Sequence, residues 1–168
     1  MALQSLDRFC HWLSETLLSQ TIQTVGWVIP AVQTVHILAV AAVVSSALMI
    51  DLRLLGLRGT DQPLAILARR FWPFIWWPLP ILLASGAVLI IAEPARDLEN
   101  PVFLLKMGLL LAATGVTLAC QIPLRTDPTF WDISAGRKRV ARLIAVASIP
   151  LWIAIVFAGR WIAYVQSS

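Results

Sequence analysis

The chain has 168 residues, of which 59% are hydrophobic and 13% are charged. Soluble domains have roughly 45–50% apolar residues, and the mean hydropathy of +0.81 also excludes water as the main solvent. A net charge of +4 would suit a nucleic-acid-binding protein if Lys and Arg clustered on a soluble face, but they lie between apolar runs. We therefore expect a protein that contacts membrane lipid and no nucleic acid.

Residues 1–21 are expected to form one amphipathic helix on the membrane surface. Phe9, Leu13 and Leu17 recur at helical spacing, while Asp7 and Glu15 lie off that stripe. The two acidic residues also interrupt the apolar core that a signal peptide needs, so we expect the segment to be retained.

Residues 22–168 are expected to form one transmembrane domain. About 20 apolar residues cross a hydrocarbon core of about 30 Å, and four runs in the chain are long enough. The expected spans are residues 25–50, 71–92, 101–123 and 140–165. The sequence therefore predicts an all-α fold, a four-transmembrane-helix bundle preceded by the interfacial amphipathic helix.

Prolines and a helix cap refine these spans. The second span opens with Pro73, Pro78 and Pro80, which predict bends because each proline lacks a backbone N–H and clashes with the preceding turn. Asn100 is the expected N-cap of the third span, with Pro101 at its first helical position. A further kink is expected at Pro150 in the fourth span.

The distribution of positive charge predicts the orientation. Nine basic residues lie in the loops after the first and third spans: Arg53, Arg58, Arg69, Arg70, Arg125, Arg137, Lys138, Arg139 and Arg142. Cytoplasmic loops are enriched in Lys and Arg. We expect a multi-pass protein of the bacterial inner (cytoplasmic) membrane with both termini on the periplasmic side, so Cys10 and Cys120 should lie on opposite sides and form no disulfide.

Small residues recur in the third span at Gly108, Ala112, Gly115 and Ala119. Such seams let transmembrane helices approach closely. We expect this seam to pack inside the bundle, with contact to a helix of a protein partner or a second copy of the chain as the alternative.

His36 is the main candidate functional residue, because an imidazole near the middle of a span normally faces the bundle interior, a cavity or a ligand. Gln33 lies one turn earlier on the same face. The ring is a candidate axial ligand to haem iron, a hydrogen-bond donor to a quinone carbonyl, or a proton relay. The structural alternative is a hydrogen bond to another helix, for instance at Ser85 or Thr117.

Four further residues bear on this site. His11 and Met107 are the candidates for a second haem ligand, although an interfacial position is the favoured explanation for His11 and core packing is the favoured one for Met107. Lys106, early in the third span, either extends its amine toward the interface or pairs with an anionic group such as a propionate or Glu93. Asp51 and Arg53, at the end of the first span, suggest a local ion pair or contact with lipid phosphates.

Two segments of the first span carry a resemblance to known proteins. They are His36-Ile37-Leu38-Ala39, followed by Ser45-Ser46, and Asp51-Leu52-Arg53-Leu54-Leu55-Gly56. The chain resembles an uncharacterised bacterial family of four-helix membrane proteins of about this length. More distantly it is similar to D-type copper-resistance membrane proteins and to haem-binding bacterial protoporphyrinogen oxidases, which implies a b-type haem with His36 at the ligand position and Lys106 at the matching lysine.

Nucleotide-binding, protease and hydrolase motifs are absent from the sequence, so we expect no independent enzyme. The favoured hypothesis is an integral membrane subunit for electron transfer or for quinone or haem handling beside a redox partner, centred on His36. The alternative is a non-catalytic membrane anchor or assembly subunit of a larger complex. A small-solute or metal transporter is a third hypothesis.

Overall fold

The computed structural model describes residues 2–162 and 164, and in this part of the chain all regular structure is helical. Four helical stretches are long and apolar enough to cross a membrane: Val28–Leu54, Leu64–Ala92, Pro101–Thr126 and Ala135–Trp161. The all-α class and the four candidate spans are therefore confirmed. The expected end of the fourth span at residue 165 lies outside the described residues.

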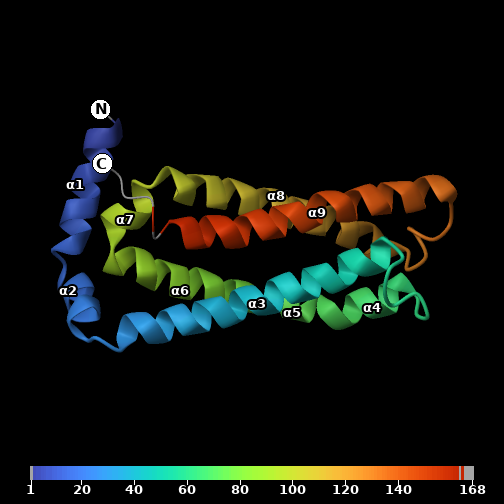
Figure 1. Ribbon diagram of the computed structural model, residues 1–168, viewed down its shortest axis with the longest axis horizontal. Coiled ribbons are helices and arrows are strands. Elements are labelled where there is room, and N and C mark those ends of the chain that lie inside the picture. The colour runs from blue at the N-terminus through green and yellow to red at the C-terminus, as the bar shows by residue number, and fades with distance from the viewer. Residues whose placement is uncertain (1, 163, 165–168) are drawn as a thin grey trace.

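The N-terminal segment forms two helices where a single one was expected. Helix α1 (Ala2–Ser14) and helix α2 (Leu17–Thr24) are separated at Glu15 and Thr16. The Thr16 hydroxyl accepts a hydrogen bond from the backbone N–H of Ser19 at 3.3 Å, which starts the second helix. Both helices lie across one end of the bundle, with α1 against the short helix α7 (Pro94–Leu98) (Figure 1). Their position at a membrane surface stays a prediction.

Helix α3 (Val28–Leu54) is the first candidate span and runs about one turn further than expected. It ends just before Gly56, which has a φ of +76°. That left-handed conformation is open to glycine without the steric cost a side chain would add, so the chain can turn sharply there.

The second candidate span is interrupted at its prolines, as expected. It consists of α4 (Leu64–Phe71), α5 (Pro73–Trp76) and α6 (Pro78–Ala92), so it starts earlier than the expected residue 71. The breaks fall at Trp72 and Trp77, each directly before a proline. Trp72 and Trp77 keep helical φ and ψ angles, but Pro73 and Pro78 have no backbone N–H to donate to the preceding turn, and this interrupts the helical hydrogen bonds.

The last two candidate spans are single helices, α8 (Pro101–Thr126) and α9 (Ala135–Trp161). The expected N-cap of α8 is confirmed, because Asn100 Oδ1 accepts from the Val102 N–H at 2.9 Å. Helix α9 starts before the expected residue 140, since the Ser134 hydroxyl caps it through the Arg137 N–H at 3.2 Å.

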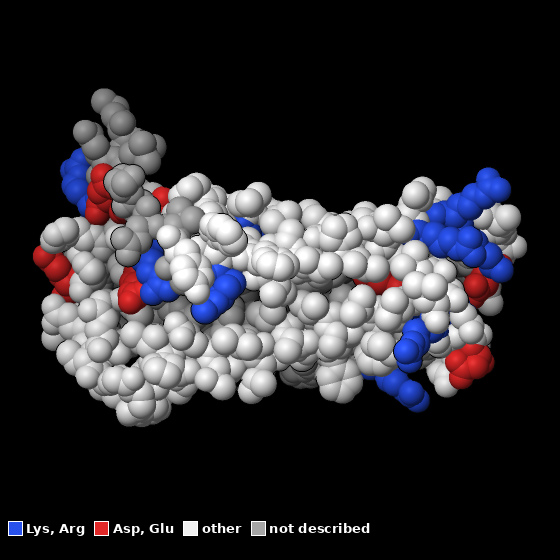
Figure 2. All heavy atoms as spheres, in the orientation of Figure 1, with Lys and Arg blue, Asp and Glu red and all other residues white. Residues whose placement is uncertain are grey.

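Among the long helices, α3 contacts both α6 and α9, and α8 contacts chiefly α9. The hydrophobic core is concentrated where α4 and α5 join the bundle, around Val43, Ile50, Leu124 and Trp152. On the face shown in Figure 2, charged residues gather toward the two ends and the middle is mostly uncharged. That distribution suits a molecule whose middle lies in hydrocarbon.

The small-residue seam of α8 faces outward, which corrects the expectation of packing inside the bundle. Gly108, Ala112, Gly115 and Ala119 are all exposed, and a Cβ built on either glycine would meet nothing within 4 Å. Because α8 is the outermost long helix, most of its surface has no neighbour in the chain. Contact with a partner's helix, the alternative considered from the sequence, stays a prediction.

Candidate functional site

His36 lies between α3 and α6 in the more thinly packed half of the bundle. Its side chain is half-buried, and the buried residues of α3 begin only at Ala39, on the core side of it. The ring is eight residues from the start of α3, which places it about 12 Å along the helix and nearer to one end than expected. It is therefore within a candidate span but not at its midpoint.

The ring is held by a hydrogen bond to α6. His36 Nδ1 lies 2.8 Å from Ser85 Oγ, and Ser85 Oγ lies 2.6 Å from the carbonyl oxygen of Ile81. The hydroxyl has a single hydrogen, which it donates to Ile81, so it offers His36 only a lone pair. Nδ1 must then carry the ring proton and donate it to Ser85. In the neutral ring this leaves a lone pair on Nε2.

Two other elements contribute to the surroundings of the ring. Gly86 of α6 has no side chain, and a Cβ atom added to it would lie 3.7 Å from His36 Cε1. The glycine therefore leaves the edge of the ring next to Nε2 uncovered. From α8, the charge of Lys106 acts on His36. The lysine side chain packs on Gly159 of α9, since a Cβ atom added to this glycine would lie 3.7 Å from Lys106 Nζ.

The anionic neighbour of Lys106 is Asp97 of α7. Burial raises the pKa of Asp97 above its ordinary value, and the positive charges of Arg96 and Lys106 oppose that rise. Glu93, the partner considered from the sequence, instead forms an ion pair with Arg96.

The remaining predicted site residues are not gathered around His36. His11 is exposed on α1, where its Nδ1 lies 3.2 Å from Glu15 Oε1. Gln33 is exposed one turn before His36, and Met107 is 37% exposed on α8. Among the described residues, no group of three or more His, Cys, Asp or Glu side chains comes together as a metal site. The structure thus brings Ser85 and Gly86 of α6 against His36, while the Lys106 side chain lies on Gly159 of α9.

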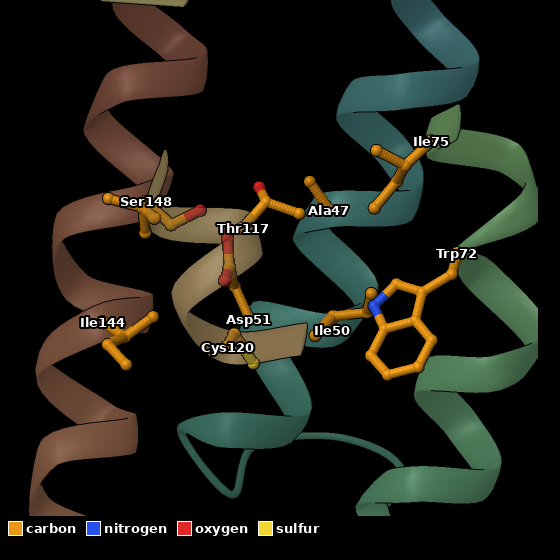
Figure 3. Close-up of a pocket in the computed structure, with 10 residues that line it drawn as sticks. Ala47, Ile50, Asp51, Trp72, Ile75, Thr117, Cys120, Ile144 and Ser148 are labelled. Atoms are coloured by element: carbon orange, nitrogen blue, oxygen red, sulfur yellow. The ribbon is translucent and has the colours of Figure 1, made fainter. Parts of the chain in front are cut away.

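A second polar site, around Asp51, was not expected from the sequence. Asp51 is only 4% exposed and lines a cavity of about 20 Å³ between α3, α8 and α9 (Figure 3). The predicted ion pair with Arg53 is not formed, because Arg53 donates from Nε and Nη2 to the carbonyl oxygen of Gln62 at 3.1 and 2.8 Å. Ser148 of α9 lines the same cavity as Asp51.

Hydrogen bonds from two tryptophans connect the elements around that second site. Trp76 Nε1 donates to Gln121 Oε1 at 3.0 Å, which ties α5 to α8. Trp131 Nε1 donates to the carbonyl oxygen of Cys120 at 3.1 Å, which ties the loop before α9 to α8. Cys120 and Cys10 are both free and buried thiols, and their expected position on opposite sides of the membrane stays a prediction.

Four apolar helices long enough to span a bilayer define a multi-pass α-helical membrane protein, with a polar pair at His36 and a buried carboxyl at Asp51. Residues 9–165 match the model of a family of unknown function, DUF6644, and the chain belongs to that family. No curated protein and no solved structure matches the chain. The expected similarity to copper-resistance proteins and protoporphyrinogen oxidases therefore gains no support.

Proposed function

We propose that this protein is an integral membrane subunit that handles a quinol or a haem for electron transfer beside a redox partner, with Nε2 of His36 as the point of contact. The observation that carries the proposal is the hydrogen-bond chain from His36 Nδ1 through Ser85 to Ile81. It leaves Nε2 of the neutral ring as an acceptor inside a candidate membrane span. An unprotonated Nε2 suits a quinol hydroxyl or an iron, and it argues against the donor role toward a quinone carbonyl.

The residues present fit a quinol more completely than a haem. A quinol releases electrons and protons when it is oxidised, and Nε2 can accept a hydrogen bond from its hydroxyl and then hold the proton. Lipid-soluble molecules can reach a half-buried ring from the bilayer. For a haem, Ser85 would orient the ligating imidazole from behind, but His11 is engaged with Glu15 and Met107 is partly exposed, so a second ligand would come from a partner.

The test is the cofactor content of protein purified from native membranes in mild detergent. We expect extractable quinone in the wild type and a loss of about 3- to 10-fold in His36→Ala, the effect of one hydrogen bond on affinity. Oxidised and reduced absorption spectra measure haem in the same samples. Gln33→Ala, an exposed change one turn away, is the control. A preparation with neither a Soret band nor quinone would contradict the proposal.

An anchor or assembly subunit is the second candidate function, favoured by the outward-facing glycines and alanines of α8. A partner helix can approach closely along such a face. We expect Gly108→Leu to abolish co-purification of a partner while leaving the fold intact, since nothing in the chain lies within 4 Å of the added Cβ. Ala84→Leu, the same enlargement on the exposed surface of α6, is the control and should retain the partner.

A further inference from the structure

The carboxyl group of Asp51 is buried inside a candidate membrane span, one turn before the end of α3. It is 4% exposed, and its Oδ2 atom has no hydrogen-bond partner although it is shielded from solvent. Ser148 of α9 lines the same cavity as this carboxyl group. Buried carboxyl oxygens are normally satisfied, so an unpartnered one beside a cavity points to an occupant.

Among the described residues, no Lys, Arg or His side chain forms an ion pair with this group. Cys120 and Thr117 of α8 and Ser148 of α9 line the cavity beside it. Trp72 and Ile75 close the side toward α4 and α5 (Figure 3). The two ion pairs in the described part of the chain are His11 with Glu15 and Arg96 with Glu93, and neither includes Asp51. An uncompensated carboxylate in this position is strongly disfavoured, so a positive charge must come from outside the protein.

The cavity has the size and the donor atoms for a small cation. Its volume of about 20 Å³ is sufficient for about one water-sized occupant. Thr117 donates its hydrogen to the carbonyl oxygen of Ala113 at 2.9 Å, which leaves oxygen lone pairs for the cavity. Ser148 Oγ and Asp51 Oδ2 supply further oxygens (Figure 3). Hard cations prefer such oxygen ligands, and the single carboxylate matches a single positive charge.

A larger polar hollow lies one turn closer to the helix ends. Its volume is about 160 Å³, and its lining includes Arg53 and Leu54 of α3 and Ala141 and Arg142 of α9. Asp51 and Ile144 belong to the next turn of the same two helices, in the lining of the cavity. The larger hollow therefore lies on the side of the cavity that faces the basic end of the molecule.

We propose that Asp51 is an exchangeable binding site for a small monovalent cation, either a proton or a sodium ion, with Thr117 and Ser148 as the neighbouring oxygen donors. The site is independent of the function proposed for His36. A bound cation neutralises the carboxylate, and its exchange alters the charge between α3, α8 and α9, the helices that meet there.

Dicyclohexylcarbodiimide tests the site directly, because it adds to a protonated carboxyl group in apolar surroundings and forms a stable acylurea. The folded wild-type protein is labelled in detergent over a series of pH values, in sodium chloride or choline chloride of equal ionic strength. Mass spectrometry then identifies the modified peptide. We expect labelling at Asp51 that decreases as the pH rises, and none at this position in Asp51→Asn.

The sodium and choline arms separate the two cations. Protection by sodium but not by choline identifies a sodium site, while a pH dependence that sodium leaves unchanged identifies a proton site. Ser148→Ala retains the carboxyl group and should shift the half-labelling pH or the half-protecting sodium concentration by up to about tenfold. It also tests the site if Asp51→Asn fails to fold. Asp61→Asn, in an exposed loop, should change nothing.

Two results would overturn the proposal. One is a folded wild-type protein in which Asp51 is not labelled at any pH. The other is labelling of Asp51 that responds neither to pH nor to sodium, since a fixed occupant or a permanently protonated group is not an exchangeable site.

Discussion

The hydrogen bond between His36 and Ser85 is the residue-level feature on which the proposed function depends. It joins α3 to α6 within the membrane domain at a distance of 2.8 Å. Hydrogen bonds between transmembrane helices contribute about 0.6 kcal/mol on average and about 1.7 kcal/mol at most. The contact is therefore modest as a stabilising interaction, and its greater effect is to fix which ring nitrogen carries the proton.

A double-mutant cycle measures this contact. We expect His36→Ala and Ser85→Ala to have a coupling energy of about 0.6 kcal/mol in unfolding by denaturing detergent. Thr117→Ala is the control, because the Thr117 hydroxyl donates its hydrogen to the carbonyl oxygen of Ala113 in the same helix. Additive effects of the His36 and Ser85 changes would show that the two side chains do not interact in the membrane domain.

Asp97 gives a prediction for the pH dependence of stability. Burial raises the pKa of its carboxyl group in the folded state, so the folded protein retains this proton at a higher pH than the unfolded chain. The contribution to stability is present below the ordinary pKa of aspartate and is lost as the pH rises through the folded-state pKa. As the pH rises through this range, the midpoint temperature of thermal unfolding should fall less steeply in Asp97→Asn than in the wild type. Parallel profiles for the two proteins would contradict the assignment.

At the level of single residues, the sequence predicted part of the site. His36 and its structural partner Ser85 were both candidates, since few polar side chains occur in the spans. Asp51 was misinterpreted because Arg53 follows it closely in the sequence. Residues two positions apart on a helix do not face each other, and that geometry could have excluded the ion pair. The neighbour Ser148 could not be found without the packing of α3 against α9.

The start of α8 depends on Asn100, which is only 1% exposed. Its Oδ1 caps the helix through the Val102 N–H at 2.9 Å, and its Nδ2 donates to the carbonyl oxygen of Ile162 at 3.3 Å. One side chain thereby joins the beginning of α8 to the end of α9. Loss of both interactions affects the most extensive contact between helices in the bundle.

Substitution at Asn100 separates its two roles. Asn100→Ala should lower the unfolding free energy by about 1 kcal/mol for the cap, and further for the bond to Ile162. Asn100→Asp keeps the cap acceptor but loses the amide donor, so it should be less destabilising than Ala. Circular dichroism during heating in one detergent gives both comparisons. An Asp variant as unstable as Ala would show that the cap contributes little.

The helices themselves were largely predictable, but their orientation was not. Apolar length gave the four spans, and Pro73 and Pro78 gave the interruptions of the second, because both depend only on local chemistry. The break at Thr16 was missed, although a threonine is a strong N-cap. The predicted inner face of α8 was wrong, because Gly108 and Gly115 indicate that another helix can approach closely but do not identify that helix. In spans that are apolar on all sides, hydropathy cannot identify the inner face.

For the whole molecule, the two ends differ in charge. The end where α3 leads into α4 and α8 into α9 carries Arg58, Arg70, Arg125 and Arg139 among its basic residues, and Figure 2 shows Lys and Arg gathered there. The other end carries fewer basic residues, together with Glu93, Asp97 and Glu99 and the helices α1 and α2. Positive charge near helix ends favours retention on the cytoplasmic side.

This asymmetry predicts that the end with α1 and α2 faces the periplasm. In a chain with Cys10→Ala and Cys120→Ala, exposed single cysteines at Thr24→Cys and Thr60→Cys report on the two ends. A membrane-impermeant maleimide applied to cells with a permeabilised outer membrane should label Thr24→Cys at once.

Thr60→Cys should react only after the inner membrane is opened, and Thr129→Cys, in the loop before α9, should behave in the same way. If both loops show the same labelling pattern, the result reflects a fixed topology and not partial labelling of damaged cells. Labelling of Thr60→Cys and Thr129→Cys in intact spheroplasts, with Thr24→Cys protected, would reverse the orientation. The hollow near Asp51 would then open to the periplasm, and a cation bound there would exchange with that side of the membrane.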